Sequence, residues 1–154
     1  ILRTILQGFG VRHVFEARDA ADAFESMRSN NPDIALVDFM LGDVDGLEFT
    51  RLVRNASDSP NKYLPIIMVS GHTDRSKIMD AINAGVNEYL AKPVKPVDVY
   101  NRFVAVIERP RRFIKSTGYF GPDRRRRQDP RYQGPWRRAS DANDDDAEAP
   151  IDFG

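Results

Sequence analysis

The chain has 154 residues, which fits one domain of ordinary size or one domain with an appendage. It contains no cysteine, so disulfides and thiolate metal sites are excluded. No apolar stretch reaches the ~18 residues that a membrane-spanning helix needs, so we expect no contact with a membrane.

The net charge of zero hides an uneven distribution along the chain. Residues 1–108 hold 12 Lys/Arg and 15 Asp/Glu, whereas residues 109–138 hold 11 Lys/Arg and only two Asp. The last sixteen residues carry six acids and no base. This shift predicts a domain over 1–108 and, over 109–154, a basic tail with an acidic terminus.

Hydrophobic spacing at the start of the chain predicts two helices and two strands. Residues 1–9 carry apolar side chains at helical spacing, and glycines follow them. Residues 13–17 are a short strand candidate. Asp19 is placed to cap a helix with a regular apolar face. Residues 33–38 are an almost continuous apolar run, which is typical of a strand buried on both faces of a parallel sheet.

The middle of the chain predicts another helix and another strand. Asp45 and Glu48 stand at the spacing of a capping box and open the helix. The side chains that this helix is predicted to bury are Leu47, Leu52 and Val53. Residues 64–70 form a second apolar strand.

Two more helices flank a third apolar strand. The first starts at Thr73 or Asp74 and stops at Gly85, with Ile78 and Ile82 inward. Residues 88–92 are the strand. Pro96 suits the first turn of the last helix. The apolar face predicted for that helix consists of Val97, Tyr100, Val104 and Ile107.

Strands and helices alternate, which favours an α/β fold with a parallel sheet covered on both faces. Three strands end on Asp38, Ser70 and Lys92. The carboxyl ends of strands in such sheets are where ligands bind, so a carboxylate, a hydroxyl and an ammonium are expected to share one rim. His13 and His72 have no partners at metal-ligand spacing and are expected at the surface.

Several short motifs together resemble the receiver domain of bacterial two-component response regulators. They are Val37-Asp38, Asp45-Gly46, Ile67-Met68-Val69-Ser70-Gly71, Ala84-Gly85 and Tyr89-Leu90-Ala91-Lys92-Pro93. Their order and spacing match the family over residues 1 to about 108. The resemblance implies a flavodoxin-like, doubly wound parallel sheet of five strands in the order 2-1-3-4-5.

The resemblance also implies a role for each rim residue. Asp38 matches the phospho-acceptor, which takes a phosphoryl group from a histidine kinase or a histidine phosphotransfer protein. Ser70 matches the switch hydroxyl and Tyr89 the switch aromatic. Lys92 matches the lysine that pairs with the phosphate, and its bond to Pro93 is expected to be cis. The resemblance implies a cytoplasmic signalling protein. Its only expected catalytic activities are its own phosphorylation and dephosphorylation, so we do not expect an enzyme.

The implied cofactor is Mg²⁺ or Mn²⁺, held by Asp38 and the backbone carbonyl of Met40. The other acidic ligands belong in the family to an opening strand, which would lie before Ile1 and is absent from this sequence. The receiver domain is therefore expected to be N-terminally incomplete. Two further departures are Gly42, where the family usually has proline, and Gly71, which replaces a frequent alanine.

The tail repeats an aromatic–Gly–Pro–x–Arg-Arg element, first in residues 120–125 and again in 132–138. We expect a largely irregular extension, because glycine and proline recur and apolar residues are sparse. Arginines interleaved with aromatic residues can bind nucleic acid through phosphate contacts and base stacking. The repeated element instead favours docking onto the receiver or a partner. Other open alternatives are a solvated extension and a degenerate receiver that only binds other proteins. A homodimer through the last helices and strand of the receiver is a further possibility.

Overall fold

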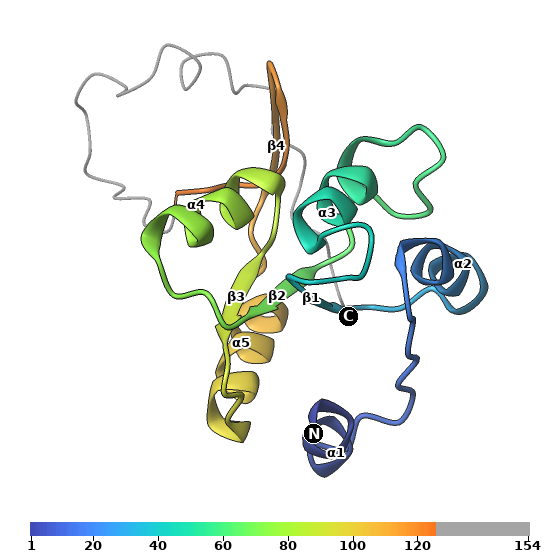
Figure 1. The fold of residues 1–154 in the computed structure, drawn as a ribbon, viewed down its shortest axis with the longest axis vertical. Helices are drawn as coiled ribbons and strands as arrows, with labels where there is room; N and C mark the ends of the chain where they lie inside the picture. The colour runs from blue at the N-terminus through green and yellow to red at the C-terminus, as the bar shows by residue number, and fades with distance from the viewer. Residues whose placement is uncertain (126–154) are drawn as a thin grey trace.

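The computed structural model describes residues 1–125. Its elements are α1 (Leu2–Gly8), α2 (Ala20–Asn30), β1 (Ala35–Asp38), α3 (Gly46–Asn55), β2 (Ile66–Ser70), α4 (Arg75–Ala84), β3 (Glu88–Ala91), α5 (Pro96–Glu108), β4 (Phe113–Ser116) and β5 (Tyr119–Pro122) (Figure 1). No helix within this part of the chain is long and apolar enough to cross a membrane.

Three parallel strands form the central sheet in the order β1-β2-β3. The middle strand is buried along its whole length, as its continuous apolar sequence predicts. Successive side chains of a strand point to opposite faces. Accordingly, Ile66 and Met68 pack with α2, α3 and α4, whereas Ile67 and Val69 pack with α1 and α5. The predicted α/β sheet with helices on both faces is confirmed.

Local signals at the helix ends behave as predicted. The side chain of Asp19 accepts a hydrogen bond from the Asp22 N–H at 2.8 Å and caps α2. That of Asp45 accepts one from the Glu48 N–H at 2.7 Å and caps α3. Gly85 follows α4 with φ of 110°, a left-handed conformation that favours glycine.

The predicted strand over residues 13–17 is wrong, since this segment has no regular secondary structure. An extended segment becomes a strand only when its backbone groups pair with a neighbour. Within the described residues β1 pairs with β2 alone, and its other edge carries no strand. The unpaired segment instead runs between α1 and α2 as an irregular connection (Figure 1).

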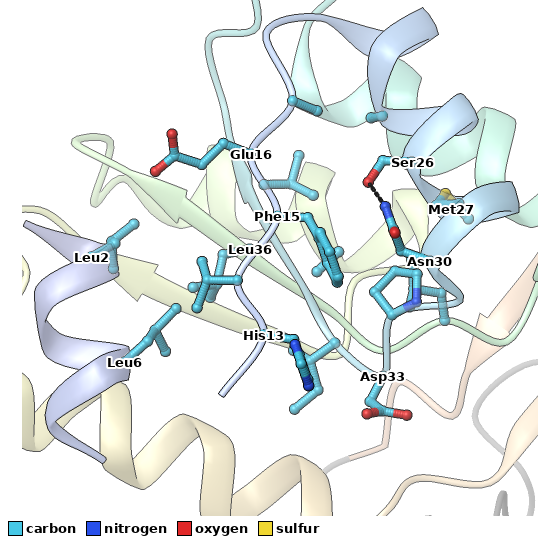
Figure 2. A pocket seen from close by; sticks show the side chains of 18 of the residues that line it. Leu2, Leu6, His13, Phe15, Glu16, Ser26, Met27, Asn30, Asp33 and Leu36 are labelled. Atoms are coloured by element: carbon cyan, nitrogen blue, oxygen red, sulfur yellow. Dashed lines mark hydrogen bonds between the residues drawn. The ribbon is translucent and has the colours of Figure 1, made fainter. Parts of the chain in front are cut away.

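A cavity of about 700 Å³ lies between this segment and β1. It is lined by apolar side chains from several elements, including Leu2, Leu6, Met27 and Leu36 (Figure 2). The cavity lies along the edge of β1 that pairs with no strand among the described residues, which is where a further strand would pair.

Two predicted helix faces need correction. Leu52 of α3 was expected to be buried but is 40% exposed. In α5 the apolar face that was expected to be buried faces outward, because Val97, Tyr100 and Ile107 are at least half exposed. The residues that α5 buries are Val99 and Val106. Both sets of residues recur at helical spacing, so the pattern alone could not choose between two apolar faces.

The start of the tail is more ordered than predicted. β4 and β5 pair as an antiparallel hairpin that follows α5, so the expectation of a largely irregular extension is wrong for residues 113–122. Two-residue turns containing glycine are a hairpin signal, and Thr117-Gly118 is such a turn, with Gly118 at φ of 82°. The second aromatic–Gly–Pro–x–Arg-Arg element, at 132–138, lies outside the described residues.

Candidate phosphorylation site

The side chains that end the outer strands meet at one rim of the sheet. Lys92, just after β3, places its Nζ 2.8 Å from Oδ2 of Asp38, the last residue of β1. Both side chains are nearly half exposed, at 45% and 42%. An exposed ion pair of this kind contributes little to stability. The Lys92 ammonium is therefore free to exchange one oxygen partner for another without a large energetic cost.

The backbone after β1 shapes the surroundings of Asp38. The Met40 N–H donates a hydrogen bond to Asp38 Oδ1 at 3.0 Å. The Gly46 N–H donates to the Phe39 carbonyl at 2.8 Å and brings the start of α3 against this loop. A Cβ on Gly46 would overlap the Asp38 carbonyl oxygen, so glycine is required there by the close approach. Gly42 has φ of 66°, which proline at this position could not adopt.

Ser70 and Tyr89 are both tied to the backbone of His72. The His72 N–H donates to Ser70 Oγ at 3.0 Å, and the Tyr89 hydroxyl donates to the His72 carbonyl at 2.6 Å. Both side chains are buried, at 1% and 7% exposure. A displacement of this short turn would therefore alter both side chains together. Sequence analysis predicted both switch residues and an exposed His72, but it missed the part that the His72 backbone plays. A serine accepting from the N–H two residues later is a recognised turn former.

The strand ends are also joined through the backbone. The Lys92 N–H donates to the Ser70 carbonyl at 2.8 Å, which holds the end of β3 beside the end of β2. The Lys92-Pro93 peptide bond is cis, as expected.

The donor chemistry at the rim suits a hard divalent cation, but this chain supplies few ligands. No group of three or more His, Cys, Asp or Glu side chains among residues 1–125 could hold a metal ion. Mg²⁺ is commonly bound by one or two carboxylates, with water and phosphate oxygens completing the shell. The Asp38 carboxylate and a neighbouring carbonyl fit part of such a site.

Comparison with protein families identifies the class of this protein. Residues 1–103 match the family described as the response regulator receiver domain. The chain therefore belongs to the response regulator receiver family, whose members act as phosphoryl acceptors in two-component signal transduction. Receiver domains typically signal rather than catalyse, and they interact with histidine kinases or phosphotransfer proteins.

Individual relatives support the same assignment. The chain is 30% identical over 109 residues to the chemotaxis protein CheY of Pseudomonas aeruginosa, a match covering 71% of this chain and 86% of that protein. Chemotaxis protein CheY4 of Vibrio cholerae is similar in structure, with a TM-score of 0.61 and 26% identity over 68% of this chain and 85% of that one.

A third relative bears on the metal. It is the receiver domain of a sensor histidine kinase from Pseudomonas aeruginosa, with a TM-score of 0.58 and 28% identity over 67% of this chain and 82% of that one. That structure has a magnesium ion coordinated in its active-site cleft.

Proposed function

We propose that Asp38 is the residue that accepts the phosphoryl group, from a phosphohistidine of a histidine kinase or phosphotransfer protein. One oxygen of the Asp38 carboxylate attacks phosphorus and forms an O–P bond. The N–P bond of the donor breaks, and its imidazole, protonated on the other nitrogen, leaves as the neutral ring with the bonding electron pair. The observation that carries this proposal is the 2.8 Å contact between Asp38 and Lys92 at an exposed strand end.

The residues around Asp38 suit the demands of this reaction. Phosphoryl transfer needs positioning and charge neutralisation more than covalent assistance. The Met40 N–H holds one carboxylate oxygen and so orients the group. Lys92 offers its ammonium to the oxygens of the incoming phosphoryl group. The attack by water that later releases inorganic phosphate restores the same carboxylate.

We assign a Mg²⁺ or Mn²⁺ ion to the same rim, with the Asp38 carboxylate and the Met40 carbonyl as the ligands from this chain. When bound, such an ion neutralises negative charge that builds up on the phosphoryl oxygens. The remaining acidic ligands have no counterpart among the described residues. The open edge of β1 and the cavity beside it are where a further strand carrying them would lie.

We assign the conformational response to Ser70 and Tyr89. An acyl phosphate offers new acceptor oxygens, which reward an arrangement in which the Ser70 hydroxyl donates to them. In this structure Ser70 Oγ accepts a hydrogen bond from the His72 N–H, and the Tyr89 hydroxyl donates one to the His72 carbonyl. Movement of Ser70 would therefore be passed through His72 to Tyr89.

The proposed output is a protein–protein contact in the cytoplasm, including a homodimer through α4, β3 and α5. Met79 on α4 and Tyr100 on α5 are exposed at 39% and 55%, so these helices present apolar side chains to a partner. Sedimentation of the full chain with and without phosphodonor tests the dimer. A mass that does not change on phosphorylation would contradict it.

Nucleic-acid binding through the tail is the alternative from another class. Many of the arginines that it needs lie outside the described residues, and three that are described have partners within the molecule. Arg111 contacts Glu88, Arg124 contacts Asn83, and Arg125 pairs with Asp123. These side chains are used within the molecule. The degenerate-receiver alternative predicts that no phosphoryl group is ever accepted. The labelling experiment described next tests this prediction as well.

Labelling with a small phosphodonor tests the proposal. We expect full-length protein incubated with Mg²⁺ and radiolabelled phosphoramidate to acquire label that alkali removes, as an acyl phosphate requires. Asp38→Asn should abolish labelling, whereas Asp43→Asn, at a nearby exposed carboxylate, should retain it. Unlabelled wild type, or labelling that survives Asp38→Asn, would contradict the proposal.

A further inference from the structure

The β4–β5 hairpin packs against α3 and α4, beside the turn that follows α4 (Figure 1). Three aromatic rings join it to the receiver. Phe113 and Phe120 of the hairpin lie 5.2 and 5.4 Å from the ring of Tyr63, which precedes β2, and 5.7 Å from each other. Clusters of this kind stabilise an interface beyond the area they bury.

Beneath the hairpin lies a buried cation, Arg54 of α3, which is only 1% exposed. Its guanidinium donates to the carbonyls of Gly85 and Lys62 at 3.0 and 2.8 Å and to Asn87 Oδ1 at 3.0 Å. None of the described acidic side chains forms an ion pair with it. The Phe113 ring covers the guanidinium at 4.9 Å. Burial lowers the pKa of Arg54 to about 9, so the group is still charged at neutral pH.

The backbone of the hairpin also approaches the turn after α4 closely. A Cβ on Gly121 would lie 3.2 Å from the Gly85 Cα, and one on Gly85 would lie 3.0 Å from Cγ of Arg54. Arg124 donates to Asn83 at 3.1 Å. The first aromatic–Gly–Pro–x–Arg-Arg element therefore contacts the receiver at both ends, through the ring of Phe120 and the guanidinium of Arg124.

Arg54 is connected to the phosphorylation site through one side chain. Asn87 Oδ1 accepts from Arg54 and also from the Ile66 N–H at 2.9 Å. Ile66 begins β2, which ends at Ser70, and Asn87 directly precedes β3, which leads to Lys92. Asn87 Oδ1 thus helps to hold the starts of the two strands together, beside the backbone hydrogen bond from the Asn87 N–H to the Ile66 carbonyl at 2.8 Å. The far ends of these strands carry the switch hydroxyl and the phosphate-pairing lysine.

We propose that Arg54 is a positioning residue for phosphoryl transfer, and that the docked hairpin holds it in place by covering its guanidinium with Phe113. Through Asn87 the guanidinium helps to set the position of β3 along β2, and so the position of Lys92 relative to Asp38. The hairpin is then a working part of this receiver. This inference rests on the proposed role of Asp38.

The test uses three variants of the full chain. Arg54→Lys keeps the charge but loses the fork of donors, and Phe113→Leu keeps an apolar side chain but removes the ring. Lys115→Ala, at an exposed hairpin position, is the matched control. Each is labelled with phosphoramidate and Mg²⁺ well below its melting temperature. Circular dichroism of the same samples reports the folded fraction, and the initial rate of labelling per folded molecule reports the geometry of the site.

We expect Arg54→Lys and Phe113→Leu to keep the wild-type folded fraction but to have an initial labelling rate at least threefold lower, with Lys115→Ala unchanged. Amide NMR signals of residues 89–92 should shift in the same two variants without any phosphodonor. Wild-type rate constants together with unshifted signals at 89–92 would overturn the proposal. If wild type is never labelled, the role of Asp38 fails, while the NMR shifts still decide whether the hairpin positions β3.

Discussion

The proposed phosphoryl transfer needs only a few side chains, and the sequence places them far apart. Asp38 and Lys92 lie 54 positions apart and still make a direct contact. Their meeting could be predicted from sequence, because parallel strands bring their carboxyl ends to one rim. The hydrogen bonds made by the Met40 N–H and by the His72 backbone could not, since they depend on how two short loops turn.

Removing the Lys92 ammonium tests its share of the charge neutralisation. We expect Lys92→Gln to slow labelling of Asp38 by roughly 10²-fold, the usual cost of losing one group that stabilises charge in the transition state. Folding should be little affected, because the ion pair is exposed. Lys95→Gln, at an exposed lysine three positions on, is the control and should be labelled at the wild-type rate. Equal rates for both variants would remove Lys92 from the mechanism.

Gly46 offers a second test at this scale. A methyl group there would press on the Asp38 carbonyl, so we expect Gly46→Ala to lower the free energy of unfolding by about 1–3 kcal/mol. The α3 terminus would move, and labelling of Asp38 should slow as well. Gly8→Ala in α1, where a Cβ would meet nothing within 4 Å, should leave stability unchanged or slightly raised. Stability is measured by denaturant unfolding. A Gly46→Ala protein that is as stable as wild type would contradict the close approach of Gly46 to the Asp38 carbonyl.

At the scale of elements, the hydrophobic pattern predicted where helices and buried strands lie but not how each is used. Residues 13–17 have the sequence of a strand, yet a strand forms only beside a pairing partner. The outer stripe of α5 is as periodic as its buried stripe. The hairpin was missed because Gly and Pro were interpreted as signs of irregular structure, although Gly118 makes a tight turn between two short strands.

The hairpin has a characteristic pH response through Tyr119. Burial raises the pKa of Tyr119 to about 12 from an ordinary value of 10.0. The unfolded chain therefore loses this proton first, and stability falls as the pH rises from about 10 towards 12. The other ionisable groups are common to wild type and Tyr119→Phe, so their difference isolates this residue.

We expect wild type to lose roughly 2 kcal/mol relative to Tyr119→Phe across that window, measured by denaturant unfolding at a series of pH values. At neutral pH, Tyr119→Phe should itself cost about 1 kcal/mol, because the Tyr119 hydroxyl donates to the Pro122 carbonyl at 2.7 Å. A difference between the two proteins that does not vary from pH 9 to 12 would show that the hydroxyl is not buried in solution.

At the scale of the whole molecule, the abrupt change of charge near residue 108 does not mark the end of the folded part. The chain continues through Arg111 and the hairpin, which packs on the receiver and covers Arg54. Several basic side chains that look like a free binding surface in the sequence have internal partners in the fold. Composition located the boundary between the acidic and basic segments, but the packing of Phe113 and Phe120 on Tyr63 shows that the hairpin and the receiver fold together.

The most direct test of the central claim is to locate the phosphoryl group after transfer. The full chain would be phosphorylated from a phosphohistidine donor with Mg²⁺, the acyl phosphate reduced with borohydride, and the modified residue identified by peptide mass spectrometry. We predict a single modified position, Asp38, at the end of β1 and within reach of Lys92. Modification of Asp33, Asp43 or Asp45 instead, or of no residue, would contradict the account.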